Sequence, residues 1–497
     1  MSAAPIRVLL PVFVAALLTG CMGTLAPRYE QPAAPIPTQW PKSTGVLAEK
    51  PIDIPWQTLV ADPRLRQVVQ LALDNNRDLR VAVLNIEKAR AQYGIQRATL
   101  FPEVSAGLGG NSGRTPASVS PTGTTVVNHV YSANLGVTAY ELDLFGRVRS
   151  LNEQALQQYL ASEEAQRASR IGLISEVAVT YFNLAADIER LTLARDTLGS
   201  RQQAYDLQRQ LREFGSTSDL TLRQAEAEQE AAQDLALALE STVATDRNAL
   251  ELLVGTPLPT ELHPDAPLEA MLAMQDLPTG LPSDLLQRRP DILAAEHVLI
   301  GAQANIGAAR AAFFPRITLT GGFGRASDSL SDLFDGASRA WNFLPQISIP
   351  IFTGGRLNAN LKVAEVDRDI ALASYERSIQ AAFREVADSL AVRATLDGRL
   401  SAQQRQVDAS NAAYKLVRQR YDNGVSGYLE VLDAQRTLHA AQQNWIAVRQ
   451  AKLANLVTLY KALGGDLSLG TVEANKATNS TDPFGRNNDE RLAVRSQ

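Results

Sequence analysis

The sequence contains few of the residues that build reactive centres or crosslinks. Its 497 residues include one cysteine and four histidines, and the histidines lie far apart, without the spacing of metal ligands. A single cysteine excludes an internal disulfide. Lys and Arg total 48 against 53 Asp and Glu, and this balance gives no sign of nucleic-acid binding. The sequence also lacks a nucleophile elbow and a phosphate-binding loop, so we expect no enzyme, metal site or cofactor.

The beginning of the chain contains an apolar run, Val8 to Leu18, which follows Arg7. The run is too short to span a bilayer as a permanent helix and has the form of a signal peptide. It leads into Thr19-Gly20-Cys21, and small residues directly before a cysteine resemble the lipobox of bacterial lipoproteins. That resemblance implies cleavage before Cys21, acylation of its sulfur and new amino terminus, and, because Met22 is not aspartate, an outer-membrane address. The alternative is a chance cysteine after an ordinary signal peptide.

Much of the remaining chain is present twice. Residues of the first half return 209 positions later in the second, and the pairs are Ala204/Ala413, Tyr205/Tyr414, Leu207/Leu416, Arg209/Arg418, Gln210/Gln419 and Gly215/Gly424. Upstream, Phe101-Pro102 returns as Phe314-Pro315, 213 positions later. The change of offset places a four-residue insertion in the first copy. Repeats of this length are too long for solenoid units and predict two copies of one unit.

Each copy predicts a helix, two strands around a polar loop, a very long helix, a tight turn and another helix. The first helices, about 62–100 and 283–313, end at the Phe-Pro pairs, since proline interrupts a helix. Proline-free runs rich in Ala, Gln, Arg, Glu and Leu predict the long helices at about 147–211, 219–254, 356–420 and 428–463. A helix of about 65 residues spans roughly 97 Å.

Four stretches alternate apolar and polar residues with period two and predict strands at about 103–112, 130–142, 316–325 and 341–352. A soluble sheet is the common alternative, but the neighbouring helices offer little apolar surface to cover one. Tyr131, Trp341 and Phe352 lie near strand ends, as in the aromatic girdles of membrane barrels. Because about eight strands are needed to close a barrel, several chains would share it.

These patterns predict six segments. They are a signal peptide (1–20), a lipidated proline-rich segment (21–61), the first repeat (62–256), a linker (257–282), the second repeat (283–465) and a polar tail (466–497).

Several motifs, in order and spacing, resemble the outer membrane factors of tripartite efflux pumps. They are Arg289-Pro290-Asp291-Ile292, Phe313-Phe314-Pro315, Gly355-Arg356, Tyr421-Asp422-Asn423-Gly424-Val425, Val431-Leu432-Asp433-Ala434-Gln435-Arg436 and Leu459-Tyr460-Lys461-Ala462-Leu463-Gly464-Gly465. The lipidated OprM/NodT-like branch is the most similar, and TolC is more distant. The resemblance covers roughly residues 62–465.

The resemblance implies a mainly α TolC-like fold, in which a homotrimer forms a twelve-stranded barrel and a long α-helical coiled-coil tunnel. It implies a passive outer-membrane exit duct of an RND-type system, which exports small molecules such as drugs. The expected partners are a periplasmic adaptor protein, an inner-membrane pump and outer-membrane lipid. The alternatives are the exit duct of a type I secretion system and a lipid-anchored coiled-coil scaffold without a pore.

By the same resemblance, the pore narrows at the helix after the second tight turn. Leu429, Asp433 and Arg436 match gate positions, and their spacing of four and three places them on one helical face. Glu430 matches a second acidic pore position, about 100° away on the helix. The turns that would dock the adaptor contain Gly215, Ser216, Thr217, Ser218, Gly424, Val425, Ser426 and Gly427. The alternative for the gate residues is an ordinary solvated coiled-coil face.

Cys21→Ser should abolish acylation and leave an uncleaved or mislocalised precursor, because no other thiol can accept the lipid. The intact mass of the mature wild-type protein measures this directly. A mature wild-type mass without added lipid would show that the lipobox interpretation is wrong.

Overall fold

The computed structural model describes residues 23–40, 54–265, 267–273, 277 and 289–465. Cys21, the predicted signal peptide and the tail beyond residue 465 lie outside them. The fold divides into two compact units. The first takes its described residues from Met1–Ala33, Leu84–Glu163 and Ala294–Arg377, and the second takes them from Ala34–Val83, Glu164–Leu293 and Ser378–Gln497. Because each unit uses segments of both repeats, the two copies fold together.

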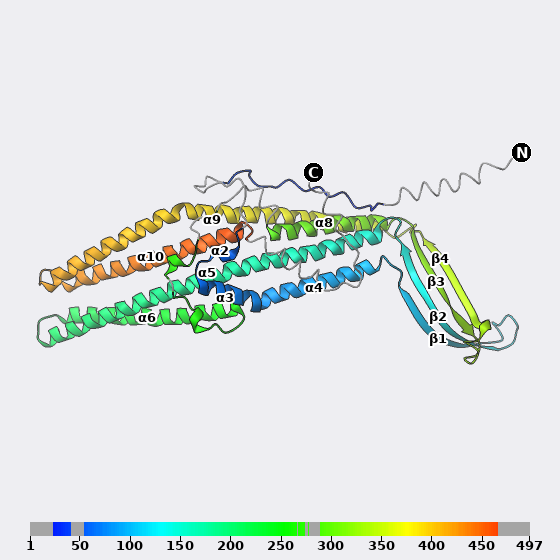
Figure 1. The fold of residues 1–497 in the computed structure, drawn as a ribbon, viewed down its shortest axis with the longest axis horizontal. Helices are drawn as coiled ribbons and strands as arrows, with labels where there is room; N and C mark the ends of the chain where they lie inside the picture. Colours follow the sequence, from blue (N-terminus) through cyan, green and yellow to red (C-terminus); the bar gives the residue numbers. More distant parts are fainter. Residues whose placement is uncertain (1–22, 41–53, 266, 274–276, 278–288, 466–497) are drawn as a thin grey trace. The chain divides into compact units, whose positions relative to one another are not determined.

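The first unit contains a four-stranded antiparallel sheet (Figure 1). Its strands are β1 (Val104–Thr115), β2 (Val126–Leu142), β3 (Arg316–Ser327) and β4 (Arg339–Ser348), in the order β1-β2-β3-β4. The central β2–β3 pairing joins the two repeats. The four strands that the alternating pattern predicted are therefore all present, and β2 begins earlier and β4 ends earlier than the predicted bounds.

The strand register separates the residues into two kinds of row. One row of directly paired residues is apolar and consists of Ala106, Leu135, Phe323 and Trp341. The neighbouring row is small or polar and consists of Ser105, Gly136, Gly322 and Asn342. Because adjacent rows point to opposite faces, the sheet has one apolar and one polar face. The apolar row is exposed, so the described residues provide no core beneath this face.

The described residues also form seven longer helices: α3 (Pro63–Asn75), α4 (Arg77–Ala98), α5 (Arg147–Glu213), α6 (Asp219–Val254), α8 (Pro290–Ala311), α9 (Arg356–Asp422) and α10 (Tyr428–Ala462). Short helices are α2 (Trp56–Leu59), η1 (Thr260–Leu262), η2 (Leu268–Ala270) and η4 (Gly336–Ser338). The repeat is visible in their lengths, because α5 and α9 each contain 67 residues, followed by 36 in α6 and 35 in α10.

The first predicted helix, about 62–100, is wrong in one respect, because it is broken at Asn76 between α3 and α4. The Asn76 backbone is extended, its side-chain oxygen accepts from Leu79 N at 2.8 Å, and its side-chain nitrogen donates to Leu253 O at 2.8 Å. Asparagine thereby ends one helix and caps the next. The end of α6 packs here, where Gly255 has φ +77° and a Cβ atom would lie 2.5 Å from Asn75 O. This close approach requires glycine.

The second unit has a well-packed centre. Segments from α2, α3, α5, α6 and η2 contribute fully buried side chains, among them Trp56, Leu59, Leu65, Tyr181, Phe182, Leu184, Leu250, Leu268 and Met271. These residues also account for the apolar character of α5. By length and composition, α5 and α8 could each cross a membrane. Most of the apolar stretch of α5, however, is buried among its neighbours. The composition of α5 is thus that of a packed helix.

Two carboxylates face each other between α5 and α6. Asp187 is buried and accepts a hydrogen bond from Arg190 at 2.5 Å, while Asp246 lies beside it and has a buried oxygen. Burial, followed by the hydrogen bond and charge of Asp187, raises the pKa of Asp246 to about 6. The folded protein therefore holds a proton that the unfolded chain releases at lower pH.

This pair predicts a pH-dependent stability. A carboxyl group whose pKa is raised by folding destabilises the folded state as pH rises from about 4 through about 6. Asp246→Asn should therefore be more stable than wild type at neutral pH, by about 1 kcal/mol after allowance for partial exposure, and equally stable near pH 4. Thermal unfolding of the detergent-solubilised protein across this range measures the difference. The exposed Asp234→Asn is the control, and the same pH trend in both variants would contradict the assignment to Asp246.

Candidate functional site

Helices α5 and α6 form one long hairpin, and helices α9 and α10 form a second. Both hairpins end in turns of the same construction. Gly215 and Gly424 both have positive φ, +68° and +72°. After each glycine, the next amide donates back to the end of the helix, from Ser216 N to Leu211 O at 2.7 Å and from Val425 N to Arg420 O at 2.9 Å. This is the pattern of a Schellman motif, in which glycine reverses the chain without strain. The predicted tip residues therefore form duplicated tight turns.

The two turns are joined by polar contacts. Gln208, buried on α5, donates to the Tyr421 hydroxyl of α9 at 2.7 Å and accepts from the Thr217 hydroxyl at 3.2 Å. Ser218 caps α6 by accepting from Thr221 N at 3.1 Å. Gly427 begins α10 without a side-chain cap. The contacts of Gln208 therefore hold the two hairpin ends together. The start of α10 lacks the side-chain cap that Ser218 provides for α6.

The first turns of α10 divide into a buried and an exposed face. Tyr428, Val431 and Leu432 are buried in a small apolar cluster with Ala225 of α6, and Tyr205, Tyr414 and Tyr421 pack around them. The predicted gate residues Leu429, Glu430, Asp433 and Arg436 are all exposed. Leu429 is an apolar side chain that is 58% exposed. Their positions fit a surface that faces a lumen or a partner.

Arg436 takes part in an interaction that the sequence did not suggest. It forms an ion pair with Glu228 of α6, and Glu228 also pairs with Arg201 of α5 at 3.1 Å. Arg201 and Glu228 are largely buried, with side chains 4% and 13% exposed. Burial is the main cause that lowers the pKa of Arg201, and the charge of Arg436 lowers it further. One carboxylate thus links three helices directly beside the predicted gate.

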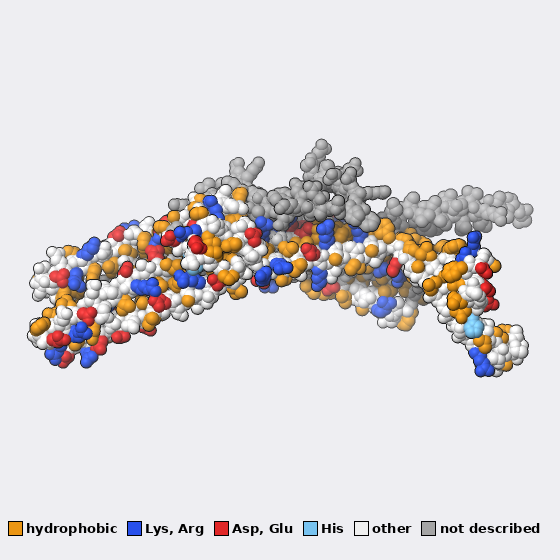
Figure 2. Space-filling model, turned by 60° about the horizontal axis from the view of Figure 1, so that its bottom comes forward, with side chains coloured by type: hydrophobic (Ala, Val, Ile, Leu, Met, Phe, Trp, Pro, Cys, Tyr) orange, Lys and Arg blue, Asp and Glu red, His pale blue; other side chains and the backbone are white. Residues whose placement is uncertain are grey.

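The surface around these helices carries mixed charge. Figure 2 shows acidic and basic side chains interspersed with hydrophobic ones along the hairpins. Many of them pair with each other, as Arg212 does with Asp219 at 2.6 Å and Arg223 with Glu226 at 2.5 Å. Asp433 differs, because among the described residues its carboxylate has no ion pair or hydrogen bond assigned to it. A free carboxylate at this place can interact with ions in solution.

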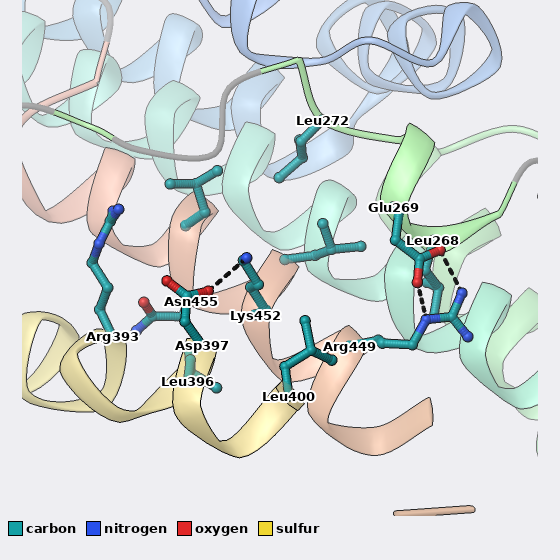
Figure 3. Close-up of a pocket in the computed structure, with 12 residues that line it drawn as sticks. Leu268, Glu269, Leu272, Arg393, Leu396, Asp397, Leu400, Arg449, Lys452 and Asn455 are labelled. Carbon is teal, nitrogen blue, oxygen red and sulfur yellow. Dashed lines mark hydrogen bonds and ion pairs between the residues drawn. The ribbon is translucent and has the colours of Figure 1, made fainter. Parts of the chain in front are cut away.

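A cavity of about 290 Å³ lies between η2, α9 and α10 (Figure 3). Leucines form much of its wall, and its charges are paired across it, Arg449 with Glu269 and Lys452 with Asp397. Arg449 also contacts Glu189 at 2.7 Å and lies 4.2 Å above the Trp445 ring. These contacts attach the segment between the repeats to the helices. We therefore interpret the cavity as a structural junction.

Among the residues that the structure describes, no group of three or more potential metal-ligating side chains comes together. The described histidines lie in separate surroundings, such as His439 beside Thr197 and His297 beside Gln157. Burial lowers the pKa of both imidazoles, so they are neutral at physiological pH.

Comparison with known proteins shows the family to which the chain belongs. The sequence pattern of the outer membrane efflux protein family matches residues 68–256 and 281–465, which cover most of the first repeat and all of the second. The chain belongs to the outer membrane efflux protein family. It lies in the OprM-like branch that its motifs indicated.

Two relatives and one solved structure show how far the similarity extends. The solvent efflux pump outer membrane protein SrpC of Pseudomonas putida is 48% identical over 471 residues, which are 93% of this chain and 98% of SrpC. Outer membrane protein OprJ of Pseudomonas aeruginosa is 45% identical, over 91% of this chain and 95% of OprJ. The solved structure is the crystal structure of the open state of the Neisseria gonorrhoeae MtrE outer membrane channel. It superimposes with a TM-score of 0.82 and 40% sequence identity, over 90% of this chain and 99% of MtrE.

These similarities confirm three of the expectations from sequence. The fold is TolC-like, with four antiparallel strands and a mainly helical remainder. The role is outer-membrane efflux, which is a transport function. The location is the outer membrane, with the helices in the periplasm.

Glu228→Gln should destabilise the protein and loosen the start of α10. The change leaves the buried Arg201 without its counterion, which we expect to cost about 2 kcal/mol, less than for a fully buried pair because Arg436 is exposed. Thermal unfolding measures the loss. Glu226→Gln on the same helix breaks only an exposed pair with Arg223 and should leave stability unchanged. Equal melting temperatures for wild type and Glu228→Gln would contradict the role given to this bridge.

Proposed function

We propose that this chain forms the exit duct of a tripartite efflux system of the RND type, through which small molecules such as drugs leave the periplasm passively. The observation that carries this proposal is an exposed apolar sheet face in the same chain as two 67-residue helices. Such a sheet suits a membrane, and such helices extend far beyond one. Relatives named for the efflux of solvents, toluene and antibiotics support small and largely apolar cargo.

The duct is a homotrimer in this proposal. Among the described residues, no strand lies beside the outer edge of β1 or of β4. Four strands cannot enclose a lumen, since about eight are the minimum for a filled barrel. Three chains, joined edge to edge from β4 to β1, would supply twelve strands and leave no free edge. The polar row of each sheet would then line the lumen, and the apolar row would contact lipid.

The exposed face of α10 supplies the gate. In a trimer, Leu429 would form a hydrophobic constriction and Asp433 a ring of three carboxylates, which attracts cations and repels anions. Glu430 lies to one side of this face. Arg436 is engaged by Glu228, so in the closed state it ties α10 to α5 and α6 instead of neutralising Asp433. Opening would require this link or the neighbouring tyrosine cluster to yield.

The paired turns at the hairpin ends supply the docking surface for a periplasmic adaptor, which connects the duct to an inner-membrane pump. The turns themselves (Gly215, Ser216, Thr217, Ser218, Gly424, Val425, Ser426, Gly427) are compact. The exposed apolar side chains at this end, Phe214, Leu220 and Val425, suit burial against a partner. An acylated Cys21 would add a lipid anchor. Transport requires no cofactor and no catalysis by this chain, because the pump drives it.

The gate assignment predicts a pair of conductance changes. Asp433→Ala should raise single-channel conductance in planar bilayers and weaken block by polyvalent cations, because the carboxylates that attract those cations are gone. Leu429→Ala should raise conductance with little change in block, because it widens the constriction without removing charge.

An exposed carboxylate away from the gate, changed in Asp408→Ala, provides the control and should leave both quantities unchanged. If neither gate variant alters conductance while the protein remains trimeric, these residues do not line the constriction. If the wild-type protein forms no channel at all, the duct itself is excluded.

A further inference from the structure

A second cavity lies in the first unit, where the strands meet the helices. Its volume is about 340 Å³. Its walls come from the end of β2, the connection between α8 and β3, and the connection between β4 and α9. β2 ends at Leu142, β3 begins at Arg316 and β4 ends at Ser348, so the cavity marks the level at which the sheet gives way to helix.

The cavity wall has an excess of positive charge. Arg147, Arg316 and Arg356 line it, together with the carboxylates Glu141 and Asp143. Glu141, whose side chain is only 11% exposed, accepts two hydrogen bonds from Arg147 at 2.7 Å and one ion pair from Arg316 at 2.6 Å. A single carboxylate therefore serves two guanidinium groups.

The remaining charges do not restore the balance. Asp143 pairs with Arg149, which lies outside the lining, through contacts of 2.9 and 3.1 Å. Arg356 is exposed, and within the described part of the chain no ion pair or hydrogen bond is assigned to its side chain. The cavity thus contains two guanidinium groups that are available to an anion. Arg356 has no assigned partner among the described residues, and Arg316 shares the Glu141 carboxylate with Arg147.

Exposed apolar side chains surround these cations. Ile351 and Phe352, between β4 and α9, are 90% and 91% exposed, and Ile349 is exposed beside them. Phe314, part of the cavity wall, stacks on Phe145 with ring centroids 4.7 Å apart. Cationic and apolar side chains occur together at the boundary between lipid headgroups and acyl chains, where each kind finds its preferred surroundings.

We propose that this cavity binds an anionic glycerophospholipid of the periplasmic leaflet, with its phosphate between Arg356 and Arg316 and its acyl chains against Ile351 and Phe352. We choose the periplasmic leaflet because the cavity lies where the strands meet the helices. The strands occupy the outer membrane, and the helices that begin at the cavity extend into the periplasm. Guanidinium groups suit this ligand, since two of them can hold the oxygens of one phosphate. The bound lipid would fix the depth of the strand ends in the membrane. The proposal rests on the membrane placement of the strands and is independent of the gate.

Native mass spectrometry of the trimer, released from nanodiscs of mixed phosphatidylglycerol and phosphatidylcholine, tests this site. The wild type should retain phosphatidylglycerol over phosphatidylcholine during progressive delipidation. Arg356→Gln and, separately, Arg316→Gln should each weaken retention about 5-fold, the loss expected for one arginine beside an anionic lipid. Arg316→Gln leaves Glu141 paired with Arg147, so it reports on the site even if Arg356→Gln fails to assemble.

Arg384→Gln is the matched control, because Arg384 is an exposed arginine of α9 that pairs only within its helix, with Asp388. It should retain lipid as the wild type does, and Arg356→Lys should keep most of the binding. Equal retention by wild type, Arg356→Gln and Arg316→Gln would overturn the proposal, as would equal retention of the two lipids by the wild type. Inorganic phosphate that binds as tightly as phosphatidylglycerol would show a phosphate site without a lipid. Channel conductance, measured on the same preparations, separates failure of this site from failure of the duct.

Discussion

The edges of the four-stranded sheet impose the condition that the rest of the structure has to meet. In the part of the chain that the structure describes, the outer sides of β1 and β4 lack strand partners. In hydrocarbon, each unpaired backbone N–H or C=O group costs several kcal/mol, so an open sheet cannot enter a membrane. In the trimer that we propose, closure by further chains would remove those edges and place the apolar row against lipid. Oligomerisation would then be part of the fold and not an addition to it.

The duplicated architecture follows from that sheet. Each repeat supplies two strands, and the strand pair continues into a helix of 67 residues that is turned back by a glycine of positive φ. The second hairpin presents charged residues on its exposed face, and the first hairpin supplies Glu228, which binds one of them. In the function that we propose, the two similar hairpins therefore have different roles, the first as the support and the second as the gate. The ion pairs that join them are partly buried, where removal of one partner is costly.

The sequence suggested candidate gate residues but not the ion pairs beside them. Leu429, Asp433 and Arg436 stand at a helical spacing that follows a recognisable turn, so local pattern and resemblance were enough to propose them. Glu228 and Arg201 belong to alanine-rich and glutamine-rich helices where many charges are solvated. No periodicity distinguishes the buried pair from exposed pairs such as Arg223 with Glu226. The sequence also did not indicate the cavity at the strand ends. Its arginines, Arg147, Arg316 and Arg356, begin three separate elements of the chain.

The sequence by itself determined the elements, because their causes are local. Period-two alternation gave four strands, the absence of proline gave the long helices, and glycine gave the turns. It misjudged the helix at 62–100, since the break at Asn76 depends on a contact with Leu253, which is distant in the chain. Only the tertiary structure decided which charges are buried, as at Glu228, or have no partner among the described residues, as at Arg356. Burial and pairing depend on distances between segments far apart in sequence, and no local pattern records them.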